Sequence, residues 1–192
     1  VMIPRSFMLG MEWATGAPGT AGEKFDITAT QENTFKIEDC EITVYVRDDG
    51  GVAENTTTIA NELIEVQKVN ILVGTVSSAN TTVLQGIAAQ NSIPLIVAPA
   101  AANDITGKDF NEFTFRTSRN NYQDAINECA YLTKQYKTFV QIAPDYAFGW
   151  GGAQAFRDAC TYYGGEFVAD DIFAPAATTD FTPYMDQILA SG

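Results

Sequence analysis

The sequence has 192 residues, of which 46% are hydrophobic and 18% are charged, so it can bury a core like other globular chains. Eleven basic and 24 acidic residues give a net charge of −13, which argues against nucleic acid and anionic membranes as partners, because both are bound through clustered Lys and Arg. No apolar run approaches the ~20 residues of a membrane span. Residues 1–192 contain no charged segment followed by an apolar stretch of the kind found in signal peptides.

Short apolar strands alternate with amphipathic helices along the first part of the chain. The residues at 15–40 fit this alternation least, although 25–29 suggest a short extra strand or hairpin. The predicted elements, in chain order, are a helix at 5–14, a strand at 41–47, a helix at 53–68, a strand at 70–74, a helix at 79–91, and strands at 94–98 and 112–115.

The alternation continues to the end of the chain. The predicted elements there are a helix at 121–136, a strand at 138–143, a helix at 150–163, a strand at 166–169 and a helix at 182–190. Asp180 or Thr182 is expected to cap the last helix, with Pro183 in its first turn. This order predicts an α/β fold with a doubly wound parallel sheet and helices on both faces.

Two strand-to-helix turns are candidate ligand sites, because open α/β sheets bind ligands beyond the carboxyl ends of their strands. In the first, Gly74–Asn80, Ser77 and Ser78 precede a helix and could hold a carboxylate without a cationic side chain. Taken alone, the pattern favours an ordinary serine helix cap. The second, Ala98–Asn103, offers a wall of small residues around Pro99, or simply a tight connection.

A third candidate site is the segment Asp145–Gly152, which follows the strand at 138–143. Tyr146, Phe148 and Trp150 concentrate aromatic surface there and could cover a ligand, while packing of some rings between helices is the alternative. The glycines of this segment lack the spacing of a dinucleotide loop.

Catalytic, metal and cofactor motifs are missing from the sequence. Without histidine there is no Ser-His-Asp or Cys-His arrangement, and neither a nucleophile elbow nor a phosphate loop occurs. The acidic pairs Asp48-Asp49 and Asp170-Asp171 stand at turns and are interpreted as solvated carboxylates rather than metal ligands. We therefore expect no enzyme activity and no cofactor.

The three cysteines are too few for a disulfide framework. Cys129 and Cys160 each fall on the apolar side of a predicted helix. Free, buried thiols are therefore favoured over a Cys129–Cys160 bridge.

The ordered motifs resemble the periplasmic branched-chain amino-acid-binding proteins, which are type I solute-binding proteins of ABC transporters. The resemblance runs from about residue 41 to the end, and more loosely from residue 5. Its pieces are Val73–Ser78, Ile93–Ala101, Phe115-Arg116-Thr117, Asp145–Gly149, Ala155-Phe156 with Gly164-Gly165, and Thr179–Pro183.

The resemblance implies two α/β lobes that close over a small ligand like a flytrap. It places lobe one at 1–118, without its first strand, and an incomplete lobe two at 119–192. The implied ligand contacts are Ser77, Ser78, Ala100, Ala101, Ala102, Tyr146 and Phe148.

Two departures from the family pattern bear on the ligand. Ala102 stands where a threonine hydroxyl is common in amino-acid binders, which leaves room for an aromatic or aliphatic carboxylate. Phe148 stands where a tyrosine is common and favours an apolar contact.

The function that the resemblance implies is capture of a small carboxylate, an amino acid or a related organic acid, for the membrane permease of an ABC importer. The protein would be periplasmic or extracellular, either free or lipid-anchored. The alternative is a sensor or receptor domain of the same fold, for example an amide or amino-acid sensor.

Overall fold

The computed structural model describes residues 2–16 and 31–191. The chain divides into two compact units, Val1–Val69 and Asn70–Gly192, which are described separately. The predicted lobe boundary after residue 118 lies within the second unit and stays a prediction. The hairpin suggested at 25–29 lies outside the described residues.

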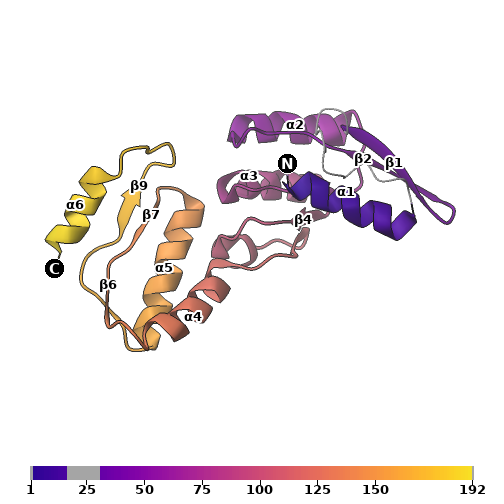
Figure 1. Ribbon diagram of the computed structural model, residues 1–192. Coiled ribbons are helices and arrows are strands. Elements are labelled where there is room, and N and C mark those ends of the chain that lie inside the picture. The colour runs from indigo at the N-terminus through magenta and orange to yellow at the C-terminus, as the bar shows by residue number, and fades with distance from the viewer. Residues whose placement is uncertain (1, 17–30, 192) are drawn as a thin grey trace. The chain divides into compact units, whose positions relative to one another are not determined.

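The first unit packs a helix against an antiparallel hairpin. It contains α1 (Met2–Thr15), β1 (Glu32–Ile37), β2 (Cys40–Tyr45) and α2 (Ala53–Glu65) (Figure 1). The helices and β2 confirm the predicted elements, but β1, whose sequence ENTFKI is half polar, was not predicted. Phe35 of β1 pairs with Ile42 across the hairpin and is buried against Met8 of α1, and it is the one buried residue of this strand.

The second unit begins with a parallel sheet in the order β3-β4-β5 (Leu72–Val73, Leu95–Val97 and Thr114–Arg116). Helix α3 (Ser78–Gln90) follows β3, and a 3-10 turn, η1 (Asn103–Thr106), follows β4. The side chain of Gln85 ties α3 to this layer, because its Nε2 donates to the Ile105 carbonyl at 2.9 Å and to Thr114 Oγ1 at 3.3 Å. These parallel strands confirm the predicted α/β class.

The rest of the second unit contains two parallel strand pairs and three helices. Its elements are α4 (Asn121–Leu132), β6 (Thr138–Phe139), β7 (Ile142–Pro144), α5 (Ala147–Tyr162), β8 (Glu166–Phe167), β9 (Ile172–Ala174) and α6 (Thr182–Ala190). The single strand predicted at 138–143 is two strands, since β6 pairs with β8 and β7 pairs with β9. Strand β9 was not predicted.

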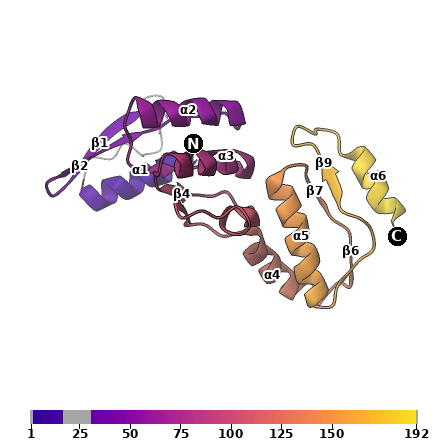
Figure 2. The same cartoon turned by 180° about the vertical axis from the view of Figure 1, so that it is seen from behind.

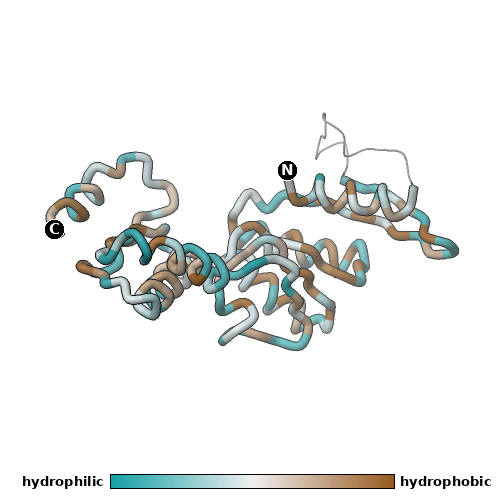
Figure 3. Tube along the Cα trace, turned by 60° about the horizontal axis from the view of Figure 1, so that its bottom comes forward, coloured by the Kyte–Doolittle hydropathy of each residue, from teal (hydrophilic) through white to brown (hydrophobic). Residues whose placement is uncertain are grey.

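Helix α6 has the predicted bounds, but the prediction that Asp180 or Thr182 caps it was wrong. Phe181 occupies the N-cap position, Pro183 lies in the first turn, and Asp180 Oδ1 accepts a hydrogen bond from the Thr182 N–H at 2.9 Å. This bond lowers the pKa of the Asp180 carboxyl. None of the helices among the described residues has the length and apolarity to cross a membrane, and Figure 3 shows polar residues interspersed along them.

Helices α4 and α5 lie side by side in both Figure 1 and Figure 2 and are joined by a disulfide. The small residues Ala125, Ala155 and Ala159 let the two helices approach closely, and their buried core contains Cys129 and Cys160. The prediction of two free thiols was therefore wrong. The apolar faces of α4 and α5 that contain these cysteines pack against each other, which brings the two sulfur atoms together in the buried core.

Arg157 of α5 anchors the segment that leads into β9. Its guanidinium forms an ion pair with Asp171 and lies 4.5 Å from the ring centroid of Phe167. Partial burial raises the pKa of the Asp171 carboxyl, but hydrogen bonds from Arg157 and Gln141 outweigh this effect and hold the pKa below its ordinary value.

We expect Asp171 to make the fold sensitive to acid. A lowered folded-state pKa stabilises the protein at pH values above the unfolded-state pKa, and that stability is lost as the pH falls through the folded-state pKa. The unfolding free energy of the wild type should therefore fall between about pH 5 and pH 3 more steeply than that of Asp171→Asn, as urea denaturation would measure. Equal slopes for the two proteins would contradict the assignment.

Candidate functional site

The two predicted serines occupy different positions at the start of α3. Ser77 is the N-cap, and its Oγ accepts a hydrogen bond from the Asn80 N–H at 3.4 Å. Ser78 is the first helical residue and only 1% exposed, and its Oγ accepts from the Ala102 N–H at 3.2 Å. The ordinary serine helix cap that the sequence pattern favours is therefore formed by Ser77. The hydroxyl hydrogen of Ser78 has no acceptor among the described residues and remains available.

The alanine loop after β4 is buried and has its carbonyl groups occupied. Ala100, Ala101 and Ala102 are 2%, 2% and 3% exposed. Within the described chain, the N–H groups of Ala100 and Ala101 donate to no other group. The four carbonyls from Pro99 to Ala102 all accept hydrogen bonds. Pro99 accepts from Arg119 at 3.1 Å, Ala100 from Arg116 at 3.4 Å, Ala101 from the Asn121 N–H at 2.9 Å, and Ala102 from Arg116 at 2.7 Å. The groups of this loop that are still free to form hydrogen bonds are therefore N–H donors, and N–H donors can bind an anion.

Two guanidinium groups give the loop a positive surrounding. Arg119 forms an ion pair with Asp124 at 3.3 Å, whereas Arg116 has no carboxylate partner in the part of the chain that the structure describes. Burial, and to a smaller extent the charge of Arg119, lower the pKa of the Arg116 guanidinium below its ordinary value. An arginine stays protonated in proteins, so Arg116 adds an uncompensated positive charge beside the loop.

The aromatic segment forms the first turn of a helix, because α5 begins at Ala147 rather than at the predicted residue 150. The half-buried rings of Tyr146 and Phe148 lie 6.1 Å apart between centroids. A Cβ on Gly149 would lie 1.8 Å from the Pro144 carbonyl oxygen, so this glycine allows the helix to start directly beside β7. Trp150 is 53% exposed, and its Nε1 donates to Asp145 at 2.8 Å.

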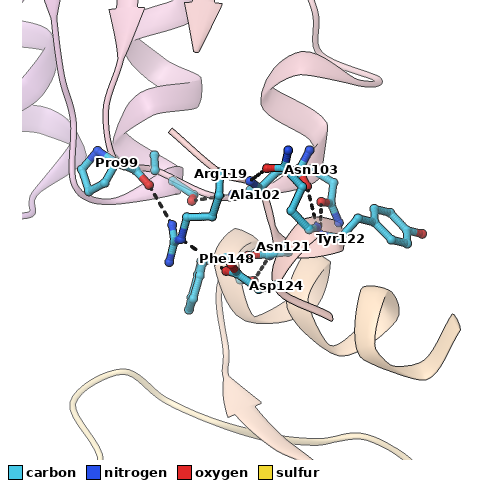
Figure 4. Close-up of polar contacts among 12 residues, drawn as sticks. Pro99, Ala102, Asn103, Arg119, Asn121, Tyr122, Asp124 and Phe148 are labelled. Carbon is cyan, nitrogen blue, oxygen red and sulfur yellow. Dashed lines mark hydrogen bonds and ion pairs between the residues drawn. The ribbon is translucent and has the colours of Figure 1, made fainter. Parts of the chain in front are cut away.

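Two asparagines that the sequence did not suggest as site residues join the alanine loop to this aromatic turn (Figure 4). Asn103 Nδ2 donates to the Gly151 carbonyl at 3.0 Å, and its Oδ1 accepts from the Tyr122 N–H at 3.1 Å. Asn121 Nδ2 donates to the Phe148 carbonyl at 2.9 Å. The partners of these bonds are far apart in sequence, so no local pattern could have identified them.

The predicted site residues are thus only partly brought together. Ser78 contacts the alanine loop directly, and the loop meets the first turns of α5 through Asn103 and Asn121. Among the described residues, no hydrogen bond joins the side chain of Tyr146 to Ser77 or Ser78. Because Ser78 and the alanines are buried here, a ligand reaches them only when the surrounding segments separate.

Two surface hollows are lined by other residues. One, of about 360 Å³, is lined by Asp170, Asp171 and Tyr184 among others, and one of about 430 Å³ lies along α1 at Leu9 and Trp13. Neither contains a predicted ligand contact.

The acidic pairs serve local structure. Asp48 and Asp49 accept hydrogen bonds from the N–H groups of Gly50 and Gly51, each at 2.9 Å, and so shape the turn before α2. Within residues 2–16 and 31–191, no group of three or more His, Cys, Asp or Glu side chains is arranged to hold a metal ion.

Comparison with known proteins gives one consistent family. The sequence matches the family described as periplasmic binding protein over residues 9–192. It is 31% identical over 164 residues to the Leu/Ile/Val-binding protein homolog 6 of Brucella abortus (strain 2308), a match that covers 84% of this chain and 41% of the relative. The chain thus spans less than half the length of the curated relatives it matches.

Solved structures agree with the sequence match. An ABC-type branched-chain amino acid transporter from Rhodopseudomonas palustris CGA009 superimposes with a TM-score of 0.68 and 31% identity, over 98% of this chain and 46% of that chain. A solute-binding protein of an ABC transporter from Rhodopseudomonas palustris HaA2, in complex with p-hydroxybenzoic acid, gives a TM-score of 0.67 and 30% identity, over 78% and 40% of the two chains.

Proposed function

Because the chain belongs to the periplasmic binding protein family, we propose that the full-length protein is the extracytoplasmic solute-binding component of an ABC importer, where it captures a small carboxylate for a membrane permease. The relatives and the fold are those of solute-binding proteins of type I, not of enzymes. Ligand capture takes place between two lobes, which meet after residue 118, by hinge closure.

The proposal rests on the environment and hydrogen bonding of the Ser78 hydroxyl. Its hydroxyl is buried at the N-terminus of α3, is oriented by the Ala102 N–H at 3.2 Å, and keeps its hydrogen unused among the described residues. A helix N-terminus and free N–H groups favour a negative charge, and an anion bound there is held without a cationic side chain in direct contact. The N–H groups of Ala100 and Ala101 supply further donors.

The proposed ligand class is the chemical group common to the ligands of two similar solved structures. One similar structure is a branched-chain amino acid transporter component and another holds p-hydroxybenzoic acid, and both ligand types carry a carboxylate. Ala102 offers no side-chain hydroxyl, and the Tyr146 and Phe148 rings supply apolar contact surface for the body of the ligand.

The Cys129–Cys160 disulfide supports the extracytoplasmic location. Structural disulfides persist in oxidising compartments such as the periplasm and are rare in the cytosol. The periplasmic binding protein family is itself extracytoplasmic. The proposal covers both a free periplasmic or extracellular protein and one attached by a lipid anchor.

Isothermal titration calorimetry of the full-length protein tests the function. The panel pairs each carboxylate with its neutral amide: leucine with leucinamide, benzoate with benzamide, and 4-hydroxybenzoate with its amide. We expect at least one carboxylate to bind and its amide to bind at least about tenfold more weakly, because a neutral amide gains less from the donors around Ser78. Equal affinities for acid and amide, or no binding by the whole panel, would overturn the proposal.

A further inference from the structure

We propose that Asn103 is a latch whose side-chain amide holds the two lobes closed. The inference rests on the proposed function, including a lobe boundary after residue 118, and concerns a residue for which neither the sequence motifs nor the relatives suggested a role. It identifies the contact that has to break when the site opens to admit its ligand.

Both ends of the Asn103 amide are engaged across the proposed boundary. Its Nδ2 donates to the Gly151 carbonyl in α5 at 3.0 Å, and its Oδ1 accepts from the Tyr122 N–H in α4 at 3.1 Å. A donor on one side and an acceptor on the other fix the orientation of the amide, so both partners must be in place together. Asn103 belongs to the alanine loop, while both partners follow residue 118.

Helix α5 packs directly against the loop and against Asn121 at Gly151. A Cβ built at this position would lie 3.6 Å from the Asn103 backbone nitrogen and 3.3 Å from Asn121 Nδ2. The distance to Asn103 is that of an ordinary van der Waals contact, so the Gly151 carbonyl lies within reach of the asparagine amide.

Asn121 supplies a matched control, because its side chain bonds within the second lobe. Its Nδ2 donates to the Phe148 carbonyl at 2.9 Å, and both residues follow the boundary. Asn121 is 3% exposed. Removing its side-chain amide takes one hydrogen-bond donor away from the Phe148 carbonyl. The hydrogen bonds of Asn103 are unchanged by this substitution. The backbone N–H of residue 121, which bonds to the Ala101 carbonyl at 2.9 Å, remains in an alanine variant.

The two asparagines should therefore differ in what they control. Loss of the two Asn103 hydrogen bonds shifts the open–closed equilibrium toward the open form by about ten- to thirtyfold, because each bond adds a modest net stabilisation to the closed form alone. Ligand affinity falls by no more than this factor, because it scales with the fraction of the protein in the closed form. Loss of the Asn121 amide destabilises both forms alike.

The test compares Asn103→Ala and Asn121→Ala in the full-length protein by single-molecule FRET without ligand. Dyes are attached through azide-bearing residues at Lys108 and Tyr162, whose exposed fractions are 74% for the Lys108 side chain and 83% for Tyr162. We expect Asn103→Ala to populate the long-distance state, with a small fall in melting temperature because the closed form loses two hydrogen bonds. We expect Asn121→Ala to keep the wild-type distance distribution and melt at a lower temperature.

The latch is overturned if Asn103→Ala leaves the distance distribution unchanged, or if its only effect is the lower melting temperature expected for Asn121→Ala. Since these distances are measured without ligand, they separate the latch from the proposed function. A wild type that binds no carboxylate but opens on loss of Asn103 would disprove the ligand assignment and leave the latch standing.

Discussion

Replacing Cys129 and Cys160 together by alanine is expected to lower the unfolding free energy of the oxidised protein by about 3–4 kcal/mol. The two cysteines are 31 residues apart and link α4 to α5. Without the link, the unfolded chain regains the entropy of that loop, which is the main source of the loss in the chain-entropy account. The loss should concentrate in the unit that begins at Asn70, which contains both helices.

Chemical denaturation under oxidising and reducing conditions measures this effect. Cys40→Ala is the matched control, because Cys40 is an exposed free thiol and its loss should leave the midpoint in place. The reductant should lower the wild-type midpoint to that of the double variant and leave the double variant unchanged. A double variant as stable as the oxidised wild type would show that the disulfide does not stabilise this fold.

Ser78→Ala is expected to weaken carboxylate binding about ten- to a hundredfold. A hydrogen bond to a charged group contributes about 1.5–3 kcal/mol, which corresponds to this factor. The variant also leaves the Ala102 N–H without its acceptor, so a smaller loss of melting temperature should accompany the loss of affinity.

Ser77→Ala separates binding from helix capping. Ser77 caps α3 through the Asn80 N–H, so its loss should lower stability by about 0.5–2 kcal/mol and leave affinity nearly unchanged. Calorimetric titration and thermal melting of both variants are the measurements. A Ser77 variant that loses as much affinity as the Ser78 variant would show that helix integrity, and not the Ser78 hydroxyl, governs binding.

Most of the element order could be predicted from the sequence because buried strands and amphipathic helices carry strong apolar periodicity. The failures have local physical reasons. Strand β1 is half polar and buries only Phe35, and β9 directly follows the acidic pair Asp170-Asp171, which the sequence pattern places at a turn. The start of α5 was placed too late because glycines oppose helix formation, whereas Gly149 is required there by the nearby Pro144 carbonyl.

The disulfide could not be predicted because it depends on which helices become neighbours. A cysteine on an apolar helix face has the same local pattern whether it is free or paired. Only the packing of α4 beside α5 brings the Cα atoms of Cys129 and Cys160 to 4.8 Å.

The candidate site shows the same limit. Ser78 and the alanine loop could be named because each follows a strand in the chain. The partners of Asn103 and Asn121 lie 48 and 27 residues away in sequence, and such bonds become visible only in the fold. The motifs thus identified the segments of the site but not the polar contacts that hold them together.

The central claim is that the Ser78 hydroxyl binds the ligand carboxylate, and a thermodynamic cycle tests it most directly. Wild type and Ser78→Ala are each titrated with the best carboxylate of the panel and with its neutral amide. We predict that the substitution weakens binding of the carboxylate about ten- to a hundredfold and changes binding of the amide little. Equal losses for acid and amide would contradict the account, since Ser78 would then support the site without recognising the carboxylate.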